Sequence, residues 1–119
     1  MPTTAPLTIP ATVYVVSHQV WDDTGVTSGG FTWHTTESGA RAAYTEEVAA
    51  WAGCTARVRL VLYPVPEPLQ APWSDHNRAA LTDWIDARIE MVEDSPAQGG
   101  LPALAVALIG VPAHAHTVR

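Results

Sequence analysis

The sequence predicts a small α+β domain whose strands and helices follow in the order β-β-α-β-α-β. Segments rich in β-branched and aromatic residues alternate with two segments of helical periodicity, and glycine- or proline-containing turns separate them. The length of 119 residues fits one domain. We expect a four-stranded, mostly antiparallel sheet with both helices on one face. Residues 1–10 are predicted to be an extended N-terminal arm, and residues 11–119 the single domain.

The first two strands are predicted to form an antiparallel hairpin. Residues 11–22 (ATVYVVSHQVWD) and 31–36 (FTWHTT) have the composition of strands. The segment between them, residues 23–30 (DTGVTSGG), holds three glycines and is predicted to be the turn. A third strand is expected over residues 55–63 (TARVRLVLY), where apolar and polar side chains alternate before Pro64.

Two segments have helical periodicity. Residues 37–52 place Tyr44, Val48 and Trp51 on one face, and Thr36 or Ser38 is suited to cap the start. Residues 74–94 form the clearest element, with Ser74 or Asp75 as the cap. The buried face of this second helix is predicted to consist of Leu81, Trp84, Ile85, Ile89 and Val92.

The last apolar segment, residues 101–111 (LPALAVALIGV), fits a buried strand or a buried helix, because periodicity alone does not separate the two. Gly110 and Pro112 would interrupt a helix. We therefore expect a strand of about eight residues near the middle of the sheet.

Charge and composition exclude several functional classes. Twelve acidic residues against six basic ones, all arginine, give a net charge of −6. Such a balance argues against direct contact with nucleic acid or with an anionic membrane, and it suits a basic partner. The chain has one cysteine, no signal-peptide pattern at its start and no apolar run that spans a bilayer. A cytoplasmic protein is the expectation.

Six acidic side chains are predicted to line one face of the second helix. At about 100° per residue they fall within an arc of about 100°, roughly opposite the apolar face. Such an arc is typical of a solvated helix surface, but it also suits a basic partner. The arc holds no basic residue, although carboxylates three or four positions apart repel each other, and this favours the partner. We call this set the acidic stripe: Asp75, Asp83, Asp86, Glu90, Glu93 and Asp94.

Histidines provide a candidate metal site. If the hairpin turns near Val26, His18 and His34 face each other across its two strands. His114 and His116 form an H-x-H pair whose side chains point the same way on a strand. Imidazoles from adjacent strands are suitable zinc ligands. The alternative is that these are ordinary surface or half-buried histidines.

Sequence motifs of enzymes and cofactor-binding proteins are missing. The chain has no G-x-S-x-G elbow, no phosphate-binding glycine loop, no H-E-x-x-H and no cysteine pair. Cys54 follows the end of a predicted helix, where the helix dipole disfavours a thiolate. We therefore expect no cofactor and no catalytic residue, and an enzyme is the less favoured class.

Residues 13–48 resemble the layout of small accessory proteins of phages and mobile elements. In that layout a β-hairpin with a polar turn runs into a helix start of the type seen here at residues 36–40 (TESGA). The resemblance covers about a third of the chain. Proteins of this kind include anti-CRISPR and other host-defence inhibitors. The resemblance implies a non-enzymatic protein that acts by binding through an acidic surface, and it supplies no site residues.

These observations predict a non-enzymatic protein-binding module that attaches its acidic stripe to a larger protein with a basic surface. Where that surface normally binds nucleic acid, the module would inhibit by competition. Two alternatives stay open. One is a small metal-dependent enzyme or metal-binding protein built on the four histidines. The other is a structural subunit that forms homo-oligomers through an apolar sheet face.

Overall fold

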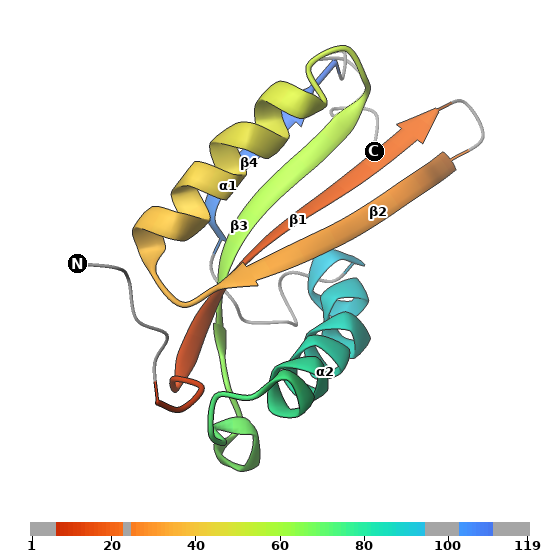
Figure 1. The fold of residues 1–119 in the computed structure, drawn as a ribbon. Helices are drawn as coiled ribbons and strands as arrows, with labels where there is room; N and C mark the ends of the chain where they lie inside the picture. The colour runs from red at the N-terminus through yellow and green to blue at the C-terminus, as the bar shows by residue number, and fades with distance from the viewer. Residues whose placement is uncertain (1–6, 23–24, 95–102, 111–119) are drawn as a thin grey trace. The chain divides into compact units, whose positions relative to one another are not determined.

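The structure, a computed structural model, describes residues 7–22, 25–94 and 103–110, apart from the side chains of residues 25–28 and 90–94. The elements are β1 (Thr12–Asp22), β2 (Gly25–His34), α1 (Glu37–Ala50), β3 (Ala56–Pro64), the 3-10 helix η1 (Glu67–Leu69), α2 (Asp75–Asp94) and β4 (Ala103–Ile109) (Figure 1). The strands form one antiparallel sheet in the order β2-β1-β3-β4. The predicted α+β class and the order of its strands and helices are confirmed.

The chain divides into two compact units. One consists of Met1–Val13 and Leu62–Pro102, and the other of Tyr14–Val61 and Ala103–Arg119, each within the described ranges. Strands β1 and β3 contribute residues to both units. Among the described residues, no helix combines the length and the apolar composition that a bilayer crossing requires.

In the unit built on Tyr14–Val61, helix α1 lies along one face of the sheet (Figure 1). Thr36 caps the helix as predicted, because its hydroxyl oxygen accepts a hydrogen bond from the Gly39 N–H at 3.2 Å. The core beneath α1 consists of Val16, Ala40, Val58 and Leu60. Partly buried side chains from α1 and β4 pack against that core: Ala43, Tyr44, Val48, Trp51, Ala105 and Ile109.

The second strand begins earlier than predicted. Strand β2 already begins at Gly25, so Gly29 and Gly30 lie inside the strand, opposite Gln19 and His18. The reason for a glycine is visible at Gly30, where an added Cβ would lie 3.1 Å from Cε1 of the His18 ring. Gly30 therefore makes room for a side chain of the neighbouring strand, and the predicted turn is wrong over residues 25–30, which lie in β2.

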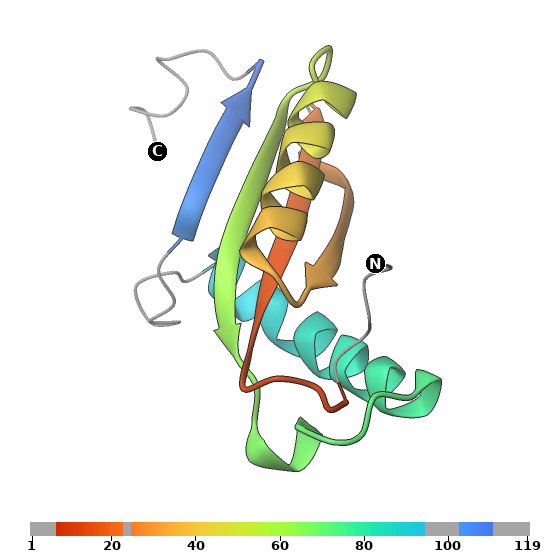
Figure 2. The same ribbon diagram turned by 60° about the vertical axis from the view of Figure 1, so that its left-hand side comes forward.

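Strand β4 lies at the edge of the sheet. It pairs with β3, with Arg59 opposite Val106, and it is the last strand in the sheet order (Figure 2). The prediction of a strand is confirmed, but its predicted place near the middle of the sheet is wrong. A continuous apolar run is typical of a central strand, and here the same run leaves Leu104, Val106 and Leu108 37%, 49% and 47% exposed.

The other unit holds α2 and the start of the described chain. Ser74 caps α2, because its Oγ accepts from the Asn77 N–H at 3.1 Å. Thr8 forms a β-bridge with Pro72, and on either side of it Ile9 N–H bonds the Ala71 carbonyl and Trp73 N–H bonds the Leu7 carbonyl. The buried apolar side chains of this unit are Ile9, Val13, Tyr63, Val65, Leu81 and Ile85. The last residues of the predicted N-terminal arm thus belong to a packed unit.

Candidate functional site

The acidic stripe lies on a helix whose opposite face is anchored in a core. Leu81 and Ile85 are completely buried. Asp83, which lies between them in the sequence, and Asp86, which follows Ile85, are exposed. Burial of two aliphatic side chains fixes the rotation of α2 about its own axis, and this rotation turns the two carboxylates to solvent. The fold therefore holds the described part of the stripe toward solvent.

The N-terminal end of the stripe carries a compensating charge. Asp75, with a side chain 96% exposed, forms an ion pair with Arg78 three residues later. The Arg78 guanidinium also lies 5.2 Å from the centre of the Trp73 ring, a cation–π contact. Arg78 is outside the acidic arc, but its long side chain reaches Asp75. The stripe is accordingly less acidic at this end than helix geometry predicts.

Asp83 and Asp86 lie in the middle of the helix, away from the Asp75–Arg78 ion pair. Neither forms an ion pair with another residue that the structure describes. Arg88, the nearest basic residue in sequence to Asp86, places its guanidinium 5.0 Å from the centre of the Trp84 ring. Glu90, Glu93 and Asp94 belong to the helical backbone of α2, and their side chains lie outside the described part.

The histidines do not come together as predicted. In the observed register His34 pairs with Tyr14, and His18 pairs with Gly30. The two histidines are four residues apart along the sheet, or about 14 Å at 3.4 Å per residue, which is too far to share a zinc ion. His114 and His116 lie outside the described residues. Within the described ranges no three histidine, cysteine or acidic side chains form a metal-binding group.

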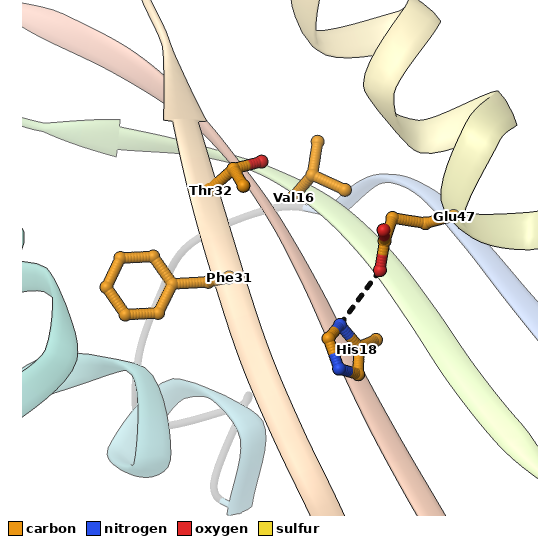
Figure 3. A pocket seen from close by; sticks show the side chains of 5 residues that line it. All are labelled: Val16, His18, Phe31, Thr32 and Glu47. Carbon is orange, nitrogen blue, oxygen red and sulfur yellow. Dashed lines mark ion pairs between the residues drawn. The ribbon is translucent and has the colours of Figure 1, made fainter. Parts of the chain in front are cut away.

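His18 instead contacts the helix α1. Its Nδ1 lies 2.9 Å from Oε1 of Glu47 (Figure 3). The Trp51 indole N–H donates to the same oxygen at 3.1 Å. The His18 and Trp51 rings lie 4.9 Å apart between centres. Since a carboxylate only accepts, His18 Nδ1 must carry the hydrogen. The sequence offers one signal for this cluster, the four-residue spacing of Glu47 and Trp51, but none that points to His18.

A small cavity adjoins this cluster. Its volume is about 60 Å³, and Figure 3 shows the lining side chains, which are Val16, His18, Phe31, Thr32 and Glu47. A cavity of this size has room for a few water molecules. A carboxylate that orients an imidazole is also found in general bases. In this structure the contact connects β1 and α1.

His34 occupies a different environment on β2. Its Nε2 lies 2.8 Å from the Thr32 hydroxyl, and burial lowers the pKa of its imidazole from the ordinary value of 6.5. Burial likewise raises the pKa of the Tyr44 hydroxyl on α1. Neither pKa shift comes from a neighbouring charge, so both shifts result from the burial of the two side chains.

The acidic stripe on α2 is thus the candidate site that the described surface retains. Cys54, the one cysteine, is exposed and unpaired among the described residues. In comparisons with known proteins, no family model, no curated protein and no solved structure matches this chain.

Proposed function

We propose that this protein is a non-enzymatic binding module that attaches the acidic stripe of α2 to a basic surface on a larger protein. The single observation that carries the proposal is the pair Asp83 and Asp86, which are exposed and without an ion-pair partner among the described residues, on a helix fixed by buried Leu81 and Ile85. Carboxylates held in place in this way meet a basic partner without the cost of reorganisation.

Electrostatic physics defines how such a module binds. The chain carries a net charge of −6, so the whole molecule is drawn toward a basic surface, and the stripe sets the orientation of the complex. Basic protein surfaces commonly hold nucleic acid. A module that covers such a surface competes with nucleic acid, and we propose that it acts in this way as an inhibitor of a nucleic-acid-handling defence complex.

The experiment compares three immobilised proteins in cell lysate: wild type, Asp83→Arg/Asp86→Arg and the control Glu46→Arg/Glu67→Arg. Both double variants change the net charge by the same amount, but the control changes exposed carboxylates outside α2. A partner is expected to be retained by wild type and control and lost from the stripe variant. Identical retention by all three proteins would contradict the proposal.

The captured partner then allows a quantitative test. Two reversed charges within the interface are expected to raise Kd by at least about 100-fold, since juxtaposed like charges cost several kcal/mol. Added salt is expected to weaken wild-type binding. Duplex DNA or single-stranded RNA should displace the protein from a partner that binds nucleic acid, and a partner with no affinity for either would contradict the inhibitory role.

A further inference from the structure

The small cavity beside α1 combines polar and apolar lining side chains. Its volume is about 60 Å³, and it is partly open to solvent. Val16 and His18 line it from β1, Thr32 lines it from β2 and Glu47 from α1 (Figure 3). Phe31 also borders the cavity, but its ring points away from the other four side chains. A ligand in this cavity would therefore meet one aliphatic side chain and three polar ones.

The Glu47 carboxylate is held in position and has capacity for a further hydrogen bond. Its Oε1 lies 2.9 Å from Nδ1 of His18 and accepts the Trp51 indole N–H at 3.1 Å. Its second oxygen, Oε2, accepts no hydrogen bond from a residue that the structure describes. Within the described ranges no arginine forms an ion pair with Glu47. A carboxylate has about four lone-pair sites, so Oε2 is available to a ligand that donates.

Thr32 supplies a second acceptor on the sheet side of the cavity. Its Oγ1 lies 2.8 Å from Nε2 of His34. A hydroxyl has one hydrogen and two lone pairs, so Oγ1 keeps at least one lone pair whichever of the two atoms donates. Thr32 is exposed, and the Glu47 side chain is 34% exposed. A ligand from solvent can therefore reach both acceptors.

These groups favour a small cation that donates hydrogen bonds. The carboxylate repels anions, and a metal ion would need more protein ligands than the described residues bring together. A primary ammonium group carries one positive charge and three N–H donors. Its first methylene group would lie against the apolar side chain of Val16. The volume is also suitable, because an ammonium head of about two or three heavy atoms takes the space of a few water molecules.

We propose that this cavity binds a primary alkylammonium group, with Glu47 Oε2 and Thr32 Oγ1 as its acceptors and Val16 beside its first methylene group. The rest of the alkyl chain leaves through the open side of the cavity. A free amine or a lysine side chain of another protein can supply such a group. The site uses no residue of α2, so it is independent of the binding that we propose for the acidic stripe.

Ethylammonium tests the class of ligand, with ethanol as the neutral comparison and acetate as the anionic one. At about pH 8 the amine keeps its charge. NMR titration of the isotope-labelled full chain should then show saturable shifts of the Trp51 indole N–H and the Thr32 amide. Ethanol and acetate are expected to leave both resonances in place. Equal shifts with ethanol, or no saturable shift with ethylammonium in the millimolar range, would overturn the proposal.

Glu47→Gln tests the carboxylate, because glutamine keeps an oxygen that can accept from His18 and Trp51 but loses the charge. The Kd for ethylammonium is expected to rise at least about tenfold through the loss of one charge-assisted hydrogen bond. Glu46→Gln makes the same change at an exposed neighbour on α1 and should bind like wild type. Circular dichroism checks that both variants fold. Equal affinity of Glu47→Gln and wild type would remove Glu47 from the site.

Thr32→Val tests the second acceptor. Valine has nearly the same shape as threonine and is favoured in strands. The Kd is expected to rise about threefold, the contribution of one neutral hydrogen bond. Thr45→Val is the matched control, because Thr45 is exposed on α1 and its hydroxyl donates to the Arg41 carbonyl. An unchanged Kd for Thr32→Val would contradict the role of the Thr32 hydroxyl.

Two lysine derivatives distinguish the sources of the ammonium group. A lysine blocked at both backbone ends is compared with butylammonium, which has the same alkyl chain. Tighter binding of the blocked lysine would assign the cavity to a lysine side chain of a partner protein, and equal binding would assign it to free amines. The Nε-acetylated form of the blocked lysine has no charge and should not bind. Equal binding of the acetylated and unacetylated forms would overturn the assignment to an ammonium group.

Discussion

Nδ1 of His18 on β1 lies 2.9 Å from Oε1 of Glu47 on α1, and the same oxygen accepts the Trp51 indole N–H. This contact connects α1 to β1 at the border of a core of aliphatic side chains. His18 and Glu47 are far apart in the sequence. Gly30 on β2 has no side chain and therefore leaves the space that the His18 ring occupies.

Glu47→Ala should lower the free energy of unfolding by about 1 kcal/mol, because it removes the acceptor of two half-buried donors. Urea denaturation followed by tryptophan fluorescence measures the change. Glu46→Ala, an exposed neighbour on the same helix, is the control and should stay within about 0.5 kcal/mol of wild type. Equal effects of the two substitutions would show that the His18–Glu47 contact contributes nothing.

Stability should fall in mildly acidic solution partly because of His34. Burial lowers the pKa of this imidazole below 6.5, so the unfolded chain binds more protons than the folded chain in the window between the two pKa values. The contribution is fully present above pH 6.5 and is lost as the pH falls through the folded pKa. NMR titration should give His34 a pKa below 6.5.

His34→Gln should reduce the loss of unfolding free energy between pH 7.5 and pH 5, since glutamine does not titrate. The control is His76→Gln, the same substitution at an exposed position of α2. Identical pH profiles for His34→Gln and wild type would refute the assigned role of His34.

Gly110→Ala should destabilise the protein by about 2 kcal/mol or more. The backbone at this position has a left-handed conformation, and neighbouring atoms leave no space for a Cβ atom. The φ angle is +66°, and an added Cβ would lie 2.6 Å from the Cys54 carbonyl oxygen. Gly53→Ala is the matched control, since nothing lies within 4 Å of its added Cβ. Thermal unfolding of the two variants compares them directly, and equal melting temperatures would contradict the prediction.

Leu81→Ala should cost about 2–5 kcal/mol, the usual effect of a large-to-small change at a fully buried site. Leu81 is 0% exposed, and Leu7, at 91%, is the control for the same substitution. Guanidinium denaturation measures both. A loss below about 1 kcal/mol for Leu81→Ala would mean that α2 is not anchored by its apolar face, and the fixed orientation of the acidic stripe would then lack a basis.

Much of the fold follows from local information. The second helix, predicted over residues 74–94, is observed at Asp75–Asp94, and Ser74 and Thr36 act as the predicted caps. Alternation over residues 55–63 predicts one apolar face, and Val58 and Leu60 of that face lie in the core. Alternation gave no warning that Arg59, between them, is also buried, at 6% exposed. Arg59 lies on the opposite face of β3 from Val58 and Leu60. Whether that face is buried depends on the elements that cover it, and the periodicity of the strand gives no information about them.

The sequence by itself determined the α+β class, the order of the elements, the helix caps and the acidic arc of α2, because all of these depend on propensities and spacings within a few residues. Only the tertiary structure decided the register of the hairpin, the edge position of β4 and the meeting of His18 with Glu47. The physical reason is that strand partners and side-chain contacts are selected by packing across the whole chain. A shift of the turn by a few residues changes every cross-strand pair while leaving the local pattern intact.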